Sequence, residues 1–446
     1  MQYISNTEQD KKDMLKAVGV PSFEKLIAAV PDRLRHFKMD IPEGASELEL
    51  FRELVEIGKS NRHFHDYASF LGAGNYDHFI PTVVNHLAHR GEFITSYTPY
   101  QGEASQGTLQ FIYEYQSLIC ELTGMDYSNA SMYDGASSLA EAAVLALRSS
   151  GRKKILVPVT VHPEYRQVTR TYTSFLDCQI VEVPMKDGVT DLAKMKAAIG
   201  PDVAAVVMQQ PNFFGNLEDA QTVSDLAHGA GALFIACVNP ISLGVVAPPG
   251  EYGADIAVGE GQPLGNAVSF GGPHFGFFTV KEELLRKIPG RICGMTVDKK
   301  GRRSFVLTLQ AREQHIRREK ATSNICTNHS LCALKGAIYL SMLGQKGLKK
   351  LSLINLQKAH EAKARLLKVP GVSALNEQPF FNEFAMTIDR NAQSLKESLR
   401  RHKILGPLNL GGFYPGMESS YLVAVTENRT PQELERLALA ITEAKK

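Results

Sequence analysis

Two neighbouring stretches, Leu233-Phe-Ile-Ala-Cys-Val-Asn-Pro240 and Ile256-Ala-Val-Gly-Glu-Gly-Gln-Pro-Leu-Gly265, decide the fold class of this chain. Each begins with a short apolar run, at 233–238 and 256–258, and then passes into Gly, Pro and polar residues, which is typical of a strand that ends in a loop. Helical segments separate these runs from similar ones, and the alternation predicts an α/β domain with a mostly parallel sheet and crossover helices. The other predicted strands lie at 155–159, 179–183, 204–208 and 275–280.

Apolar periodicity predicts the helices between and around these strands. The segment 217–230 ends on Gly229 and is followed by Gly231, which suits a helix C-terminus, and 191–199 is a second crossover helix. From Ser105 onward, apolar residues are spaced for a buried helical stripe. Further helices are expected at 47–57, 139–147, 331–343, 348–367 and 431–444, and C-terminal strands at 383–388 and 421–425.

The length of 446 residues is enough for two or three structural units, at about 150 residues per domain. The element pattern changes near residues 104 and 325. We therefore expect an N-terminal arm or subdomain over 1–104, a large α/β domain over 105–325 and a smaller C-terminal α+β domain over 326–446.

Composition limits the classes of function. With 44% hydrophobic and 22% charged residues and a formal net charge of +2, the chain has no bulk attraction for nucleic acid or for an anionic membrane. Its N-terminus lacks the apolar segment of a secretory signal, and its apolar runs are too short to cross a bilayer, so we expect a cytoplasmic protein. The cysteines form no CxxC pair and the histidines no recognised ligand pattern, which predicts reduced thiols and no metal site.

The ends of the two quoted strands carry Asn239 and Gln262. In aminotransferase-like enzymes these positions supply an aspartate, which keeps the pyridine nitrogen of pyridoxal phosphate (PLP) protonated, and the lysine of the internal Schiff base. An asparagine provides no negative charge, and a glutamine amide is not a nucleophile. The next lysine, Lys281, is expected at the opposite edge of the sheet.

A possible phosphate loop precedes the helix at 139–147. The turn Tyr133-Asp-Gly-Ala-Ser-Ser138 places small residues and two hydroxyls at a helix N-terminus, where Gly135, Ser137 and Ser138 would face a phosphate. The alternative is an ordinary N-cap at a tight turn between strand and helix. The motif alone leaves both interpretations open.

Five blocks of sequence, which begin at Gly72, Tyr97, Gly259, Phe270 and Arg312, carry a resemblance to a known family. On these blocks the chain resembles the glycine decarboxylase, or P protein, of the glycine cleavage system, and within that family the subunit 1 (alpha) chains of bacteria that divide the enzyme in two. The likeness extends from about residue 60 to the C-terminus and implies the aminotransferase-like fold, PLP-dependent fold type I.

The resemblance implies a reaction that needs two chains. The partner, P protein subunit 2, would hold PLP on its lysine, form an aldimine with glycine, release carbon dioxide and pass the aminomethyl group to the lipoyl arm of the H protein. This chain would complete the partner's site through residues just before its large domain, namely Tyr97, Tyr100, Gln101 and Glu103. The alternative is that these side chains only pack the interface between the two chains.

Two basic features allow more than one interpretation. The stretch 302–320 fits a solvated helix face with salt bridges to Glu313 and Glu319, or a docking surface for the acidic H protein or the partner chain. Arg429 resembles a carboxylate-binding arginine, but a chain without an internal aldimine has no reason to hold a substrate carboxylate. The basic residues of the stretch are Arg302, Arg303, Arg312, Arg317, Arg318 and Lys320.

Two other functions compete with the decarboxylase hypothesis. One is a non-catalytic scaffold that docks the H protein and stabilises the lysine-bearing subunit without touching substrate. The other is a stand-alone enzyme of the same fold with a different nucleophile. No Ser-His or Cys-His pairing in a recognisable context supports this function. Many related sequences carry an acidic residue where Asn239 stands, and this departure argues against cofactor binding by this chain.

Overall fold

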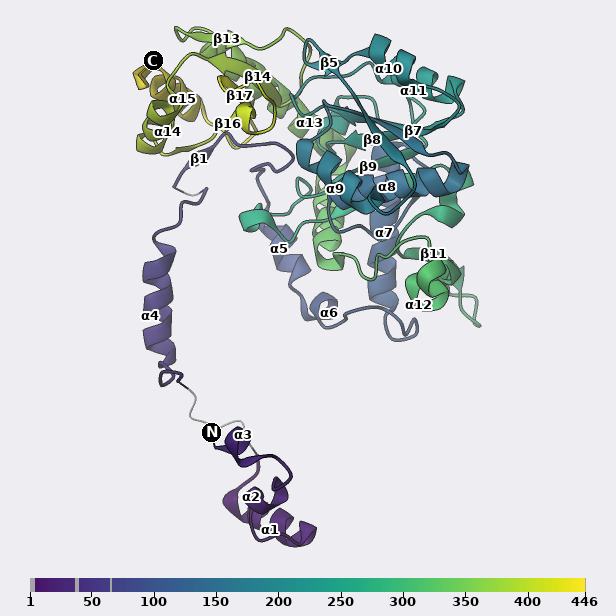
Figure 1. Ribbon diagram of the computed structural model, residues 1–446, viewed down its shortest axis with the longest axis vertical. Helices are drawn as coiled ribbons and strands as arrows, with labels where there is room; N and C mark the ends of the chain where they lie inside the picture. The colour runs from purple at the N-terminus through teal and green to yellow at the C-terminus, as the bar shows by residue number, and fades with distance from the viewer. Residues whose placement is uncertain (1–4, 37–39, 65, 446) are drawn as a thin grey trace. The chain divides into compact units, whose positions relative to one another are not determined.

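The computed structural model describes residues 5–36, 40–64 and 66–445, and the chain forms two units, 1–62 and 63–446 (Figure 1). The first unit is helical. Its longest helix is the expected one at 47–57, and Ser46 begins it with a capping box in which Ser46 Oγ and the Glu49 carboxylate bond each other's backbone N–H groups. The helices of this unit are α1 (Glu8–Val18), α2 (Phe23–Leu26), α3 (Asp32–Arg35) and α4 (Glu47–Gly58).

The second unit is built on a seven-stranded sheet with the order β2-β10-β9-β8-β7-β3-β4. Strands β4, β3, β7, β8 and β9 run parallel, β10 is antiparallel to β9, and β2 is antiparallel to β10. The predicted fold class is therefore confirmed. The strands are β2 (Tyr127–Ser128), β3 (Lys154–Pro158), β4 (Gln179–Val183), β7 (Val203–Gln210), β8 (Leu233–Val238), β9 (Ile256–Glu260) and β10 (Gly276–Val280).

Helices cover both faces of this sheet, because its central strands are apolar on both sides. In β8, Phe234 and Ala236 belong to one apolar core and Ile235 and Cys237 to another, as the two-residue period of a strand requires. The first core contains residues of α7 (Gln106–Thr123), α10 (Leu192–Ala198), α11 (Ala220–Gly229) and α13 (Ser330–Leu366). The second contains residues of α8 (Gly135–Ser150), and α9 (Pro163–Thr173) packs beside α8 (Figure 1).

All six predicted strands of the large domain are present, with ends that shift by one or two residues. The predicted helix at 217–230 starts later, at Ala220, because Asp219 caps it through a hydrogen bond from Thr222 N–H. The two helices predicted at 331–343 and 348–367 are segments of α13, which is interrupted at Gly344, where φ is 57°. A left-handed backbone is easily adopted by glycine, so the break lies where the sequence permits it.

A smaller antiparallel sheet lies in the C-terminal region, with the order β13-β14-β17-β16. The predicted strands at 383–388 and 421–425 are its central pair, β14 and β17. Its elements are β13 (Val372–Ala374), β14 (Glu383–Ile388), β16 (Leu408–Asn409), β17 (Ser420–Ala424), α14 (Ala392–Arg401) and α15 (Pro431–Glu443), and β1 (Ala68–Ser69) pairs nearby with β15 (Ile404–Leu405).

The helical interpretation of the basic stretch is wrong at its beginning. Residues Arg303–Thr308 form β12, which pairs with β11 (Ile292–Val297) in an antiparallel hairpin. Phe305 and Leu307 are buried while Val306 is exposed, so this segment has the period of a strand and not of a helix. Short helices follow at α12 (Gln314–Arg317) and η5 (Arg318–Lys320), and the ion pair that Arg302 makes is with Asp298 instead of Glu313 or Glu319.

The elements not named so far are all short. Within the described ranges, the structure contains no helix that is both long and apolar enough to cross a membrane. The remaining elements are α5 (Thr82–Ala88), α6 (Gly91–Ile94), β5 (Met185–Lys186), β6 (Val189–Thr190), η1 (Ser242–Gly244), η2 (Ser269–Gly271), η3 (Glu282–Lys287), η4 (Gln310–Arg312) and η6 (Leu410–Gly412).

Candidate functional site

A narrow pocket lies at the carboxyl ends of the parallel strands. The chain passes from β3 to β4 on one side and later from β7 in the opposite direction to β8 and β9. The neighbouring strands β3 and β7 therefore mark the switch point at which open α/β sheets bind ligands. The cavity has a volume of about 30 Å³, which is room for a water molecule or two. Its walls include Tyr76, His162, Tyr165, Asn239, Glu260 and Glu383.

Gln262 is buried beside this pocket, with 1% of its surface exposed. Its Oε1 accepts a hydrogen bond from the Tyr76 backbone N–H (2.9 Å), and its Nε2 donates to the Tyr76 carbonyl (3.0 Å) and to the Asn266 carbonyl (2.7 Å). The amide therefore pairs with the backbone as a neighbouring strand would. The sequence predicts that Gln262 stands in place of a lysine but gives no sign of this structural role.

Glu260, two residues earlier, is a site residue that the sequence analysis missed. Its Oε2 accepts from the Gly135 N–H and its Oε1 from the Gln262 N–H, both at 3.0 Å. Burial raises the pKa of Glu260 to about 8, although these backbone donors oppose the shift. A carboxylic acid that begins a loop after a strand was the only available signal, and it is too common to single out one residue.

The turn before α8 holds Gly135, Ser137 and Ser138 as the sequence places them. Asp134 is the N-cap, and its Oδ1 accepts from the Ser137 N–H (2.7 Å). The Ser137 hydroxyl accepts from the Asp134 N–H, and the Ser138 hydroxyl donates to the Asp134 carbonyl. Both hydroxyls thus take part in the cap itself, and the Gly135 N–H is bound by Glu260.

Residues 72–79, here called the strap, contribute Gly74 and Tyr76 to the wall of the pocket. The Tyr76 hydroxyl donates to Glu383 Oε2 (2.5 Å), and the Ala73 N–H donates to Glu383 Oε1 (2.7 Å). Burial raises the pKa of Glu383 to about 7. Together with Gln262, this carboxyl group fixes the strap to the ends of the large and small sheets.

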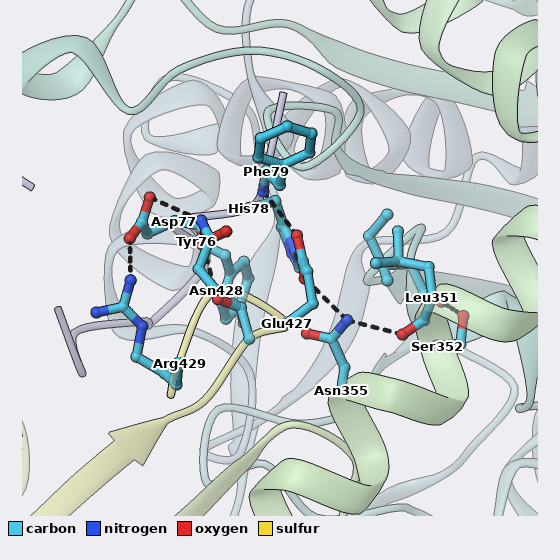
Figure 2. Close-up of polar contacts among 12 residues, drawn as sticks. Tyr76, Asp77, His78, Phe79, Leu351, Ser352, Asn355, Glu427, Asn428 and Arg429 are labelled. Carbon is cyan, nitrogen blue, oxygen red and sulfur yellow. Dashed lines mark hydrogen bonds and ion pairs between the residues drawn. The ribbon is translucent and has the colours of Figure 1, made fainter. Parts of the chain in front are cut away.

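The far end of the strap is held by Glu427 (Figure 2). Its carboxylate lies 2.8 Å from His78 Nδ1 and accepts from the Phe79 N–H (2.6 Å) and from Asn355 Nδ2 (3.0 Å). Burial alone would raise the pKa of Glu427, but the adjacent His78 and these hydrogen bonds lower it to about 2. Glu427 is thus an ionised anchor that joins the strap to α13.

Arg429 also belongs to this anchorage. Only 4% of its surface is exposed, and its Nη2 lies 2.6 Å from Asp77 Oδ2 in the strap (Figure 2). Buried ion pairs of this kind are sensitive to the loss of one partner, because the remaining charge is left without compensation. The Arg429 guanidinium thus pairs with a carboxylate of its own chain.

The loop at 97–103 lies on the surface and does not line the pocket among the described residues. Tyr97 and Tyr100 are 82% and 64% exposed. The buried Arg291 donates to the Tyr100 hydroxyl (3.4 Å), has its guanidinium 5.7 Å from the ring centre, and donates to the Cys326 carbonyl (2.8 Å). Arg291 therefore joins this loop to the segment before α13, a contact that no sequence signal indicated.

The other two predicted residues of the loop occupy its C-terminal end. The Gln101 carbonyl accepts from Ala104 N–H and Ser105 N–H, which shapes the turn into α7. Glu103 lines an open groove of about 700 Å³ beside β12. The structure thus brings Tyr97, Tyr100, Gln101 and Glu103 together on one exposed loop.

Comparison with known proteins identifies the family. The sequence profile described as "Glycine cleavage system P-protein" matches residues 1–441. The chain belongs to this P-protein family. It is 50% identical, over the full length of both chains, to a probable glycine dehydrogenase (decarboxylating) subunit 1 of Desulfitobacterium hafniense, and 50% identical over 98% of each chain to the protein of that name from Carboxydothermus hydrogenoformans.

Solved structures agree with this P-protein membership. A crystal structure of glycine decarboxylase (P-protein) in inhibitor-bound form has a TM-score of 0.91 and 46% identity, and the match covers 99% of this chain and 100% of that one. A sphingosine-1-phosphate lyase of Burkholderia pseudomallei matches with a TM-score of 0.65 at 13% identity, which shows the fold alone. The chain has the PLP-dependent fold type I.

The residues of this P-protein chain do not fit a Schiff-base cofactor in the pocket. Position 262 has no amine, and Asn239 provides no carboxylate at the end of β8. Lys281 is at the opposite end of the sheet, where its Nζ lies 3.1 Å from Asp255 Oδ1 and donates to the Gly253 carbonyl. The cavity leaves space for little more than water.

The raised pKa of Glu260 predicts a pH-dependent stability. Because its pKa is about 8 in the folded chain and 4.5 ordinarily, the folded state binds an extra proton between these values, and the contribution of Glu260 to stability falls as pH rises through this window. Glu260→Gln removes this titration. We therefore compare the free energy of unfolding of Glu260→Gln with that of wild type at pH 5 and at pH 9. The difference, variant minus wild type, is expected to be at least about 1 kcal/mol larger at pH 9, since a tenfold change in proton affinity corresponds to about 1.4 kcal/mol.

Denaturant unfolding at the two pH values measures this difference. The control is Glu164→Gln, the same substitution at an exposed position of α9. A gap between wild type and Glu260→Gln that is independent of pH, or that widens in favour of wild type at high pH, would contradict the expectation.

Proposed function

We propose that this chain is the lysine-less subunit of a two-chain glycine decarboxylase of the glycine cleavage system. In this proposal a partner chain, P protein subunit 2, holds PLP on its own lysine, and the pair decarboxylates glycine and transfers the aminomethyl group to the lipoyl arm of the H protein. The observation that carries the proposal is Gln262, which stands at the position where a Schiff-base lysine would be needed. Its amide is hydrogen-bonded to the Tyr76 backbone of the strap. The relatives named subunit 1 support it, since that name implies a second subunit.

The loop at 97–103 is the part of this chain that we assign to the partner's site. Tyr97 and Tyr100 expose most of their surface, and such large aromatic side chains are commonly placed at interfaces. The Arg291 guanidinium holds the Tyr100 ring and hydroxyl in place. A tyrosine hydroxyl held in this way provides a hydrogen bond to a phosphate or substrate, and the Glu103 carboxylate orients a proton donor.

A second surface suits the docking of an acidic protein. A cavity of about 370 Å³ is lined by Arg286, Arg312, Arg317 and Lys320 and by no carboxylate among the described residues. Charge complementarity of this kind accelerates association and selects partners more than it adds affinity. We assign this cavity to the H protein, with the partner chain as the alternative occupant.

The location of the cofactor is testable by visible absorbance. The purified chain alone is expected to show no aldimine band after incubation with PLP, whereas the complex with a lysine-bearing partner shows one, because only the partner supplies the amine. Borohydride reduction and peptide mapping identify the labelled lysine. A band linked to a lysine of this chain would overturn the proposal.

The role of the loop is tested with Tyr100→Phe and Glu103→Gln in the reconstituted complex. Each is expected to lower glycine-dependent carbon dioxide exchange by about tenfold or more, because each removes a group that holds or orients a proton at the shared site. The aldimine band of the partner serves to show that the complex is loaded. The matched controls are Tyr172→Phe and Glu251→Gln, which lie outside the loop.

Full exchange activity in both loop variants would show that the shared site is wrong. The chain would then be the scaffold considered above, which stabilises its partner and docks the H protein without touching substrate.

Docking at the basic cavity is tested with the double variant Arg317→Glu/Lys320→Glu. Both side chains are exposed, and reversing their charge is expected to raise the KM for H protein by about fivefold or more, with a smaller salt dependence and an unchanged kcat. Lys349→Glu, an exposed position of α13, is the control. An unchanged KM for H protein together with weaker assembly of the two chains would assign the cavity to the partner.

A further inference from the structure

The pocket at the strand ends contains an aromatic stack made by the chain itself. The Tyr165 ring of α9 stacks on the His162 ring, with centroids 4.7 Å apart and an interplanar angle of 23°. Phe213 packs edge-on against the same imidazole at 4.8 Å and 71°. An offset stack of this kind is the contact that a flat aromatic ligand would otherwise make with His162.

Tyr165 also closes the space in front of helix α8. A Cβ atom on Gly135, the first residue of the helix, would lie 2.4 Å from the Tyr165 hydroxyl oxygen and 2.9 Å from the Glu260 backbone nitrogen. Both distances are below van der Waals contact, so the helix start, the tyrosine and the end of β9 already touch. A planar ligand ring cannot enter between them unless Tyr165 moves.

The Glu260 carboxyl group occupies the position that a phosphate would take at this helix N-terminus. Backbone N–H groups at the start of a helix are a ready site for a phosphate, because they are free donors at the positive end of the helix dipole. Here the Gly135 N–H is bound at 3.0 Å by Glu260 Oε2, and the other carboxyl oxygen accepts from the Gln262 N–H. The two oxygens thus bridge the helix start and the loop after β9, as a bound phosphate would.

We propose that Tyr165 and Glu260 are built-in occupants of the ring and phosphate positions of a former cofactor pocket, which restoring a lysine at position 262 alone does not reopen. The strap adds a second closure, since Tyr76 is held over the pocket by Gln262 and Glu383. The inference concerns this chain alone and does not depend on a partner. It therefore stands or falls separately from the proposed decarboxylase function.

The first test measures PLP bound to the full-length chain without partner. Gln262→Lys is expected to bind none, as judged by the aldimine band and by PLP released with alkali. The triple variant Gln262→Lys/Tyr165→Ala/Glu260→Ser is expected to bind close to one equivalent per chain, with reduced cofactor on residue 262, because both occupied positions are vacated and an amine is present. Cofactor bound by the single variant, or none bound by a folded triple variant, would overturn the proposal.

A second test uses a single substitution, because three substitutions in one core can prevent folding. In Glu260→Ser the Gly135 N–H loses its carboxylate, so inorganic phosphate is expected to raise the melting temperature of this variant by a few degrees at constant ionic strength. Wild type and Glu164→Ser, the same change at an exposed site, are expected not to respond. Equal phosphate stabilisation of wild type, or none in Glu260→Ser, would show that Glu260 does not occupy the phosphate position.

Discussion

The pairing between the Gln262 side chain and the backbone of Tyr76 is the contact on which the rest of the site depends. An amide offers an acceptor and a donor, and here it uses both, toward the Tyr76 N–H and the Tyr76 carbonyl. A lysine has donors only and would leave the buried Tyr76 N–H unpaired, at a cost of about 1–3 kcal/mol. The residue that stands at the predicted lysine position is therefore also the one that holds Tyr76 of the strap in place.

Buried carboxyl groups extend this arrangement in both directions. Glu260 joins the loop after β9 to the start of α8, Glu383 joins β14 to the strap, and Glu427 joins the strap to α13. The strap leads through α5 and α6 to the loop at 97–103, so one continuous segment connects the pocket with that exposed loop. In the proposed function, this chain would support chemistry in a neighbouring chain while holding no cofactor in its own pocket.

The fold was largely predictable because its strands are buried on both faces and separated by amphipathic helices, so each has a local sequence signal. The basic stretch was misinterpreted at 303–308, because charges at Arg302 and Arg303 obscured a short strand whose alternation spans only a few residues. In the site, Gln262 and Asn239 were identifiable from their positions at strand ends. Glu260, Tyr165 and Arg291 were not, since each contacts a residue distant in sequence, namely Gly135 for Glu260 and Tyr165 and Cys326 for Arg291.

The sequence by itself determined which chemical groups are present: no lysine at 262, no carboxylate at 239, and a Tyr- and Glu-containing segment at 97–103. Those facts follow from residue identity and strand position alone. Only the tertiary structure decided what fills the pocket, because Tyr165 meets Gly135, and Glu383 meets Tyr76, across long stretches of chain. Contacts of that kind depend on how helices pack on the sheet, and no local pattern of residues encodes them.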